Sequence, residues 1–162
     1  MMQITNGAPG AMSLIKTVIA SGDEINFTAI PSGWKYLFIQ GSMASNAGNS
    51  VYLQFNGDVG ANYAANRIDY GGGAISSTNQ GVTATPYTGV TNASFRVGNE
   101  FRICQPAYAS LEKTFNAWAY HAAGGRIASA TWTNATDEIT SIKIKPTGGT
   151  FTGSMSLYGV LI

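Results

Sequence analysis

Short runs in which apolar and polar residues alternate recur along the chain and predict β-strands. In residues 25–30, Ile25, Phe27 and Ala29 share one face and polar side chains take the other. Residues 139–145 repeat the pattern, with isoleucines opposite lysines. A period of two residues is the signature of a strand with one buried face, so these runs predict strands rather than helices.

The most apolar run lies at residues 34–45 and predicts a central strand. Its two faces carry different side chains: Trp34, Tyr36 and Phe38 on one, Leu37 and Ile39 on the other. Because both faces are apolar, we expect both to pack against other parts of the structure. Residues 51–56 follow with Val51, Leu53 and Phe55 on one face, and the strand ends at an Asn-Gly-Asp turn signal.

The alternation is lost in residues 59–94, which are rich in Gly, Ala, Asn, Thr and Tyr. We expect one or two short strands there, and a tight turn or flexible loop at residues 71–73. A long irregular excursion in a compact domain is typically a binding loop or a segment ordered by a neighbour.

Regular patterns return at residues 95–104, 109–120 and 126–133, which brings the total to about nine strands. This spacing predicts an all-β fold, an antiparallel β-sandwich of the jelly-roll kind with one long mid-chain excursion. Residues 1–11 form a small-residue lead-in or arm, and residues 12–162 form a single domain. The first strand, residues 12–20, is expected to lie beside the last.

The last stretch, residues 151–162, ends on three aliphatic residues without a polar tail. Chain ends are usually frayed and polar, so this ending predicts a packed strand. Alternation places Leu157 and Leu161 toward the sandwich core. It places Tyr158, Val160 and Ile162 toward a second layer or a neighbouring subunit.

Composition narrows the classes of partner. Only 10% of the 162 residues are charged and the formal net charge is +1, so no basic surface for nucleic acid is predicted. No basic leader with an apolar core and no span of about 20 apolar residues is present, so we expect a soluble protein made in the cytoplasm, without a membrane partner. Cys104 is the single cysteine, which rules out an intrachain disulfide.

Catalytic and metal-binding groups are sparse. His121, the single histidine, lies beside a glycine pair at a strand end, which is typical of a turn residue rather than a catalytic base. Six of the eight acidic residues are predicted in turns: Asp23, Glu24, Asp58, Asp69, Asp137 and Glu138. We therefore predict no enzyme, no metal site and no cofactor. A glycan-degrading enzyme with a carboxylate pair is the alternative ranked last.

Aromatic residues are the more informative group. The three tryptophans, Trp34, Trp118 and Trp132, are predicted to lie in the core. Tyrosines in the excursion, Tyr63, Tyr70 and Tyr87, are candidates for a subunit interface or a sugar-stacking surface, because tyrosine combines an apolar ring with a polar tip.

Three segments together resemble a class of tailed-bacteriophage structural proteins. One is the strand Ile-Asn-Phe-Thr-Ala-Ile-Pro at residues 25–31. Another is Leu-Gln-Phe-Asn-Gly-Asp at residues 53–58, followed by Asn62 and Tyr63. The third is the ending at residues 151–159, preceded by Ile-Thr-Ser-Ile-Lys at residues 139–143.

The resemblance implies a virion protein with a jelly-roll sandwich, located on the capsid or the tail. Our first hypothesis is a capsid decoration or cement protein that forms a homo-oligomer, preferably a trimer, and contacts the major capsid protein. The alternative is a tail-fibre or receptor-binding module that contacts other tail proteins and recognises a host surface glycan. Neither hypothesis requires a catalytic residue.

Overall fold

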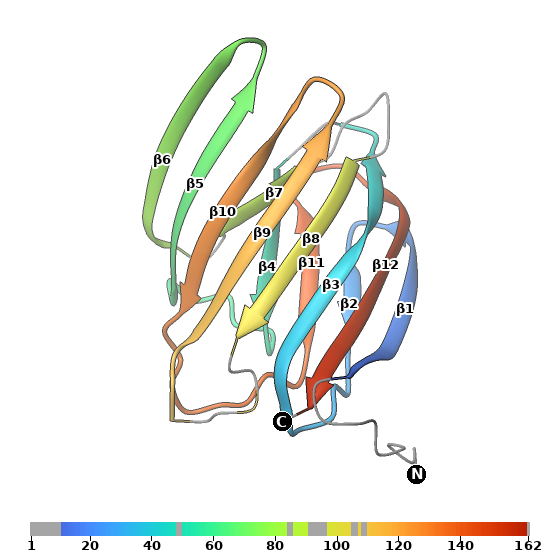
Figure 1. The fold of residues 1–162 in the computed structure, drawn as a ribbon, viewed down its shortest axis with the longest axis vertical. Coiled ribbons are helices and arrows are strands. Elements are labelled where there is room, and N and C mark those ends of the chain that lie inside the picture. The colour runs from blue at the N-terminus through green and yellow to red at the C-terminus, as the bar shows by residue number, and fades with distance from the viewer. Residues whose placement is uncertain are drawn as a thin grey trace.

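The structure is a computed structural model that describes residues 11–47, 50–83, 86–90, 97–104, 107 and 110–161. These residues form twelve β-strands and no helix (Figure 1). The strands are β1 (Met12–Gly22), β2 (Ile25–Phe27), β3 (Trp34–Ser45), β4 (Ser50–Phe55), β5 (Tyr63–Gly71), β6 (Ala74–Thr83), β7 (Tyr87–Val90), β8 (Val97–Cys104), β9 (Lys113–His121), β10 (Gly124–Trp132), β11 (Ile142–Pro146) and β12 (Phe151–Leu161). The predicted all-β class is confirmed, with twelve strands rather than about nine.

The strands form two antiparallel sheets that pack face to face. The large sheet has the order β1-β12-β3-β8-β9-β10-β5-β6, and the small sheet has the order β2-β11-β4-β7. In β1–β2, β3–β4, β7–β8 and β11–β12, the chain crosses from one sheet to the other, which is the strand order of a jelly roll. The hairpins β5–β6 and β9–β10 are insertions that widen the large sheet, as Figure 1 shows.

The first and last strands lie side by side, as the sequence predicts. Strand β12 pairs with β1 on one side and with β3 on the other. Its inner residues Phe151, Met155 and Leu157 are fully buried, and Leu161 packs against the same core. Tyr158 lies on the opposite face with Val160, as predicted, whereas Ile162 lies outside the described residues.

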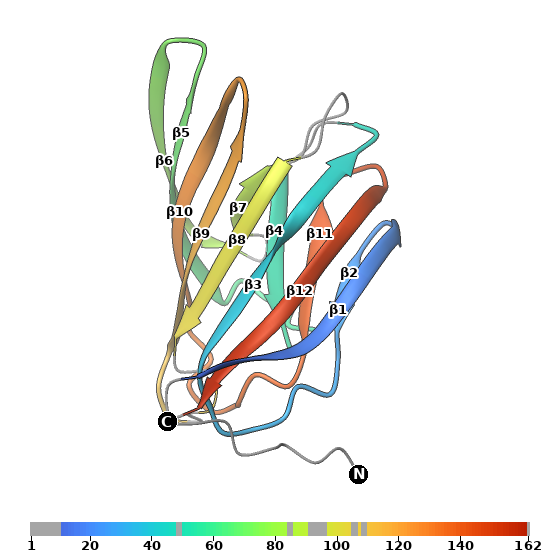
Figure 2. The same cartoon turned by 45° about the vertical axis from the view of Figure 1, so that its right-hand side comes forward.

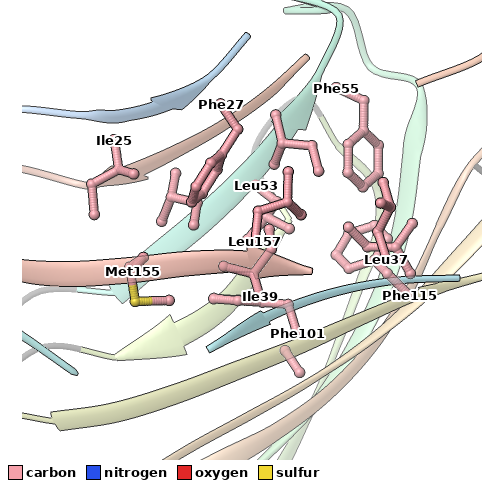
Figure 3. Packing of buried hydrophobic residues seen from close by; sticks show 14 of the residues in the cluster. Ile25, Phe27, Leu37, Ile39, Leu53, Phe55, Phe101, Phe115, Met155 and Leu157 are labelled. Carbon is pink, nitrogen blue, oxygen red and sulfur yellow. The ribbon is translucent and has the colours of Figure 1, made fainter. Parts of the chain in front are cut away.

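The core lies between the two sheets. Val51, Leu53 and Phe55 of β4 are fully buried, as their alternation predicts. They face Leu37 and other aliphatic and aromatic side chains of the large sheet (Figure 3). Burial of this apolar cluster is the main stabilising contribution in a domain of this size.

Two predictions of side-chain direction near the N-terminus are wrong. The sequence pattern places Trp34 on the same face of β3 as Tyr36. In the structure Val160 pairs with Tyr36 and Leu161 with Trp34, so Lys35 is an extra residue that forms a bulge. The bulge directs the Trp34 side chain into the core. Strand β2 ends at Phe27, and Ala29 adopts a φ of 55° in an exposed turn. Ile30 is buried in its place.

The mid-chain excursion is more regular than predicted. Within residues 59–94 the chain forms the long strands β5 and β6 and the short strand β7, while residues 84–85 and 91–94 lie outside the described part. A two-residue turn joins β5 to β6, with φ values of 57° at Gly72 and 80° at Gly73. The turn prediction for residues 71–73 is thus confirmed, but the prediction of short strands is wrong for β5 and β6.

The later strands agree better with the sequence pattern. Residues 95–104, 109–120 and 126–133 correspond to β8, β9 and β10, with ends shifted by a few residues. Asp69 was expected in a turn, but it lies inside β5 and pairs with Arg126 of β10. Aspartate is uncommon in strands, so the sequence pattern predicts a turn at Asp69. A strand position is possible here because the Arg126 guanidinium compensates the charge of the carboxylate.

The Asn-Gly-Asp segment at residues 56–58 forms the turn after β4 and is held by hydrogen bonds. Asn56 and Gly57 have positive φ values of 52° and 71°, and the Asp58 amide donates to the Phe55 carbonyl over 2.8 Å. The Asn56 side chain donates to the Glu138 carbonyl and accepts from the Thr140 amide, which ties the turn to the segment before β11. This segment therefore has a structural role.

Asp58 also fastens this turn to the core. Its carboxylate accepts hydrogen bonds from Trp132 Nε1 at 2.7 Å and from the Gly60 amide at 2.8 Å, besides those from Asn62. Burial alone would raise the pKa of Asp58, but these hydrogen bonds outweigh it and hold the pKa below its ordinary value.

The lowered pKa of Asp58 makes folding depend on pH. Its contribution is fully present above the ordinary aspartate pKa and is lost as the pH falls through the lower value of the folded state. We expect the unchanged protein to lose up to about 1 kcal/mol more free energy of unfolding than Asp58→Asn between neutral pH and pH 3, because the ordinary aspartate pKa of about 3.9 lies only about one unit above pH 3. Urea unfolding at both pH values measures this difference, and equal losses would contradict it.

Candidate functional site: the outer face of the large sheet

One face of the large sheet packs on the small sheet, and its other face, here called the outer face, has no covering layer in the described part of the chain (Figure 2). The strand register defines which residues lie on it. One row crosses six strands from β12 to β5 through Ser154, Ser42, Gly98, Tyr120, Gly125 and Tyr70. The outer face therefore brings together residues far apart in the sequence.

This face carries most of the exposed large hydrophobic side chains. Among the described residues twelve such side chains are exposed, and ten lie on the outer face by their strand register: Met12, Leu14, Ile19, Tyr36, Ile68, Tyr70, Ile75, Val82, Tyr120 and Ile127. Contiguous exposed apolar surface on a folded domain typically marks an interaction site.

The aliphatic side chains concentrate at the two ends of the outer face. We call Met12, Leu14 and Ile19 the β1 patch. We call Ile68, Ile75, Val82 and Ile127 the β6 patch. A shallow depression of about 320 Å³ lies within the β6 patch, between Ile68 and Ile127.

Strand β6 is the outermost strand at this end and is uncovered on both faces. Residues 74–79 are all exposed, and Ile75 is 81% exposed. Figure 1 shows the β5–β6 hairpin at the far end of the large sheet from β1. The strand carries no charged residue or proline, two devices that commonly block an edge strand from pairing, although it has a bulge at Gln80.

A polar groove lies between the two patches. Its volume is about 460 Å³, and it runs over β12, β3 and β8. Gln40, Ser42, Ser154 and Ser156 line it with amide and hydroxyl groups. Tyr120, on the flanking strand β9, and Tyr158, on β12 itself, also line it.

The tyrosines on this face lie over glycines. A Cβ at Gly98 would lie 2.6 Å from Cζ of Tyr120, and a Cβ at Gly125 would lie 2.5 Å from the hydroxyl of Tyr70. Because neither glycine has a side chain, each ring can lie down against the sheet instead of standing upright. Tyr120 remains 61% exposed in this position.

Arg102 occupies the middle of the outer face. Its guanidinium carbon is 5.7 Å from the ring centroid of Phe38 and 5.1 Å from that of Trp118. Its Nε is 2.9 Å from the carboxylate of Glu100, which lines the groove. The groove is therefore bordered by a compensated ion pair rather than by a net charge.

The predicted site residues separate into different environments. Tyr70 and Tyr158 both lie on the outer face, although four strands separate β5 from β12 in the large sheet. Tyr63 is fully buried, and its hydroxyl accepts a hydrogen bond from the Phe55 amide at 2.8 Å. Tyr87 lies on β7, but its side chain lies outside the described part of the structure. Ile162 also lies outside the described residues.

Burial raises the pKa of the Tyr63 hydroxyl well above its ordinary value, which fits a structural core residue. Among the tryptophans, Trp34 and Trp132 are buried as predicted. Trp118 is not a core residue: it lies on the outer face, half-buried beneath Arg102.

Tyr120 and Trp118 are the outer-face residues whose location the sequence analysis missed. Alternation within residues 113–121 separates them from the buried Phe115, Ala117 and Ala119, and this is the signal that could have placed them. The tyrosine-over-glycine pairs have no local signal, because strand pairing alone brings them together.

Groups with catalytic potential are held in structural contacts. His121 ends β9, and its Nδ1 accepts a hydrogen bond from the Ala123 amide at 3.1 Å, so it stabilises its own turn as expected. Buried Lys113 donates to the Asn134 carbonyl at 3.1 Å and lies over the Trp132 ring. Within the described ranges no three His, Cys, Asp or Glu side chains are grouped as metal ligands.

Comparisons with known proteins leave the chain without an assigned family. No protein-family model matches it, and no curated protein matches it. The described residues also contain no helix long and apolar enough to span a membrane.

Proposed function

We propose that this protein is a non-enzymatic structural subunit of a bacteriophage virion, and that it acts as a capsid decoration or cement protein by assembling with copies of itself. The observation that carries the proposal is the uncovered outer face, with its β1 and β6 patches. Apolar surface buried between subunits would stabilise the shell mechanically. The sequence resemblance supplies the virion context.

The arrangement of the two patches favours a ring. They lie at opposite ends of an eight-stranded sheet, about 34 Å apart at the usual strand spacing. Contact between the β6 patch of one subunit and the β1 patch of the next is head-to-tail, and such contacts close into a ring when the rotation between neighbours closes. Because a two-fold contact is not head-to-tail, the smallest such ring is a trimer.

Strand pairing offers a second head-to-tail contact between the same two ends of the sheet, in which the two patches would lie side by side on one continuous face. The eight strands alternate in direction, so the β6 edge of one subunit would meet the β1 edge of the next in the antiparallel sense. The uncharged β6 edge presents no like-charge repulsion to such pairing. The overhanging β5–β6 hairpin would then be covered by a neighbour.

Introducing a charge into the β6 patch tests self-association. We expect the unchanged protein to be trimeric and Ile75→Asp to be monomeric, because Ile75 would carry an unpaired carboxylate into an apolar contact. The matched control is Val59→Asp, at a loop residue that is 73% exposed and away from the outer face. Sedimentation equilibrium gives the oligomeric state.

A monomeric unchanged protein at high micromolar concentration, or an Ile75→Asp variant that stays trimeric, would contradict the proposed contact. The virion location is tested separately by quantitative mass spectrometry of purified heads and tails. Presence on heads at a ratio matching capsid symmetry supports the cement role, whereas presence on tails alone rules it out.

The second candidate function is a tail-fibre or receptor-binding module. One observation favours it: the polar groove with its tyrosines lies between the two patches and is not part of either. A subunit that uses both patches for assembly would still present this groove to a ligand.

A further inference from the structure

We propose that the polar groove on the outer face is a binding site for a neutral oligosaccharide. The inference does not depend on the virion assignment, because it rests on the groove alone. Its elements are a floor of short hydroxyl and amide side chains, two flanking tyrosines and the absence of a net charge.

The floor has the chemistry of a hydroxyl-rich ligand. Ser42, Ser154 and Ser156 offer groups that both donate and accept hydrogen bonds, and the Gln40 amide does the same. These side chains come from the neighbouring strands β3 and β12, so they form a continuous surface. The groove volume of about 460 Å³ lies within the usual range of small-molecule sites.

The tyrosines supply the apolar half of sugar recognition. A sugar ring has polar edges and an apolar C–H face, which packs on the face of an aromatic ring. Tyr120 lies over Gly98 with much of its surface exposed, so its ring is placed to receive such a face. A larger residue at position 98 would push the ring away from the sheet.

The dimensions favour a chain of sugars over a single ring. Tyr120 on β9 and Tyr158 on β12 are separated by three strand spacings, or about 14 Å, across the sheet. They are also offset by four residues, or about 13 Å, along the strands, because Tyr158 is in register with Asn116 of β9. One sugar ring cannot contact both tyrosines. An oligosaccharide lying diagonally over the strands can contact the two rings and the floor between them.

The charges around the groove select against anionic ligands. Glu100 is the charged residue that lines it, and the Arg102 guanidinium is engaged with that carboxylate and with two aromatic rings. No cluster of lysines or arginines is available to hold phosphate, sulfate or nucleic acid. The groove therefore fits a neutral glycan better than an acidic one.

Titration of the full chain with defined sugars tests the proposal. The probes are hexamers of α-1,4-linked glucose, β-1,4-linked glucose, β-1,4-linked mannose and β-1,4-linked N-acetylglucosamine, with a hyaluronan hexasaccharide as the anionic comparison. We expect saturable binding of at least one neutral probe by calorimetry, and weaker or no binding of hyaluronan.

Variants then assign the binding to the groove. Tyr120→Ala should weaken binding about tenfold or more, and Gln40→Ala should also weaken it, whereas Tyr120→Phe should retain most of it because the ring face remains. The matched control is Tyr36→Ala, a partly exposed tyrosine on the same face but outside the groove, with unchanged affinity. Thermal unfolding confirms that each variant is folded.

Two results would overturn the proposal. One is the lack of saturable binding of all four neutral probes at millimolar concentration. The other is binding that neither Tyr120→Ala nor Gln40→Ala weakens. Repeating the titration with Ile75→Asp separates this proposal from the assembly proposal, because a monomer with an intact groove should still bind sugar.

Discussion

Replacing Asp69 by alanine is expected to destabilise the fold by about 3 kcal/mol or more, because it leaves the buried guanidinium of Arg126 without its counter-ion. Arg126 is 6% exposed, and its Nε lies 2.6 Å from the Asp69 carboxylate. Its Nη1 donates to Ser50 Oγ at 3.0 Å and to the Gly89 carbonyl at 2.9 Å. One side chain therefore joins the large sheet to β4 and β7 of the small sheet.

Burial lowers the pKa of Arg126, and the hydrogen bond and charge of Asp69 oppose that effect. Removing Asp69 takes away the opposing contribution and also breaks the ion pair between Arg67 and the other Asp69 oxygen, at 3.0 Å. Hydrophobic replacement of both buried partners, as in Asp69→Leu with Arg126→Met, should recover much of the lost stability.

The matched control is Glu100→Ala, which breaks the exposed ion pair with Arg102 on the outer face. We expect that change to cost less than about 1 kcal/mol, because exposed pairs contribute little. Urea unfolding gives the free energy of unfolding of all four proteins. If Asp69→Ala cost no more than Glu100→Ala, Arg126 would not depend on its counter-ion for burial.

The parts of the fold that the sequence predicts well are strands with one buried face. Strand β4 is an example, since every second residue from Val51 to Phe55 is fully buried. Strand β12 behaves in the same way from Phe151 to Leu157. Alternation is a direct record of such burial, so these strands and their directions could be read from residue order alone.

Strand β6 shows why the mid-chain region was misjudged. A strand with both faces exposed has no reason to alternate, and its residues are mostly small or polar, apart from Ile75 and Val82. Its existence depends on pairing with β5, which depends in turn on pairing with β10, about 60 residues later in the chain. Local sequence carries no record of these long-range contacts, apart from the Gly72–Gly73 turn.

The candidate site was only partly predictable for the same reason. Tyr63 and Tyr70 are equivalent as sequence features, but they are seven residues apart on one strand and therefore face opposite sides. Tyr63 lies in the core, and Tyr70 lies on the outer face. The groove itself combines residues of β3, β8, β9 and β12, and only the topology of the large sheet brings these strands together.

Truncating Phe55 to alanine should be among the most damaging single changes to the core, with an expected loss of about 3–5 kcal/mol in the free energy of unfolding. Phe55 is fully buried at the centre of an aromatic cluster. Its ring centroid lies 5.2 Å from that of Phe115 in an edge-to-face contact (Figure 3). It lies 5.5 Å from the ring centroid of Trp132. The loss combines removed apolar contact with a cavity between the two sheets.

Phe38→Ala is the matched control for Phe55→Ala, because Phe38 is a half-buried phenylalanine on the outer face that contacts Arg102. Its loss should cost about 1–1.5 kcal/mol, since a partly hydrated ring leaves no closed cavity. Measuring both variants by urea unfolding at neutral pH separates burial between the sheets from aromatic content as such.

Similar losses in the two variants would mean that the outer face is packed as tightly as the core, and hence that it is covered by a neighbouring subunit under the conditions of the measurement. Repeating the pair in the Ile75→Asp background decides between these readings: in a monomer, only Phe55→Ala should retain the large loss.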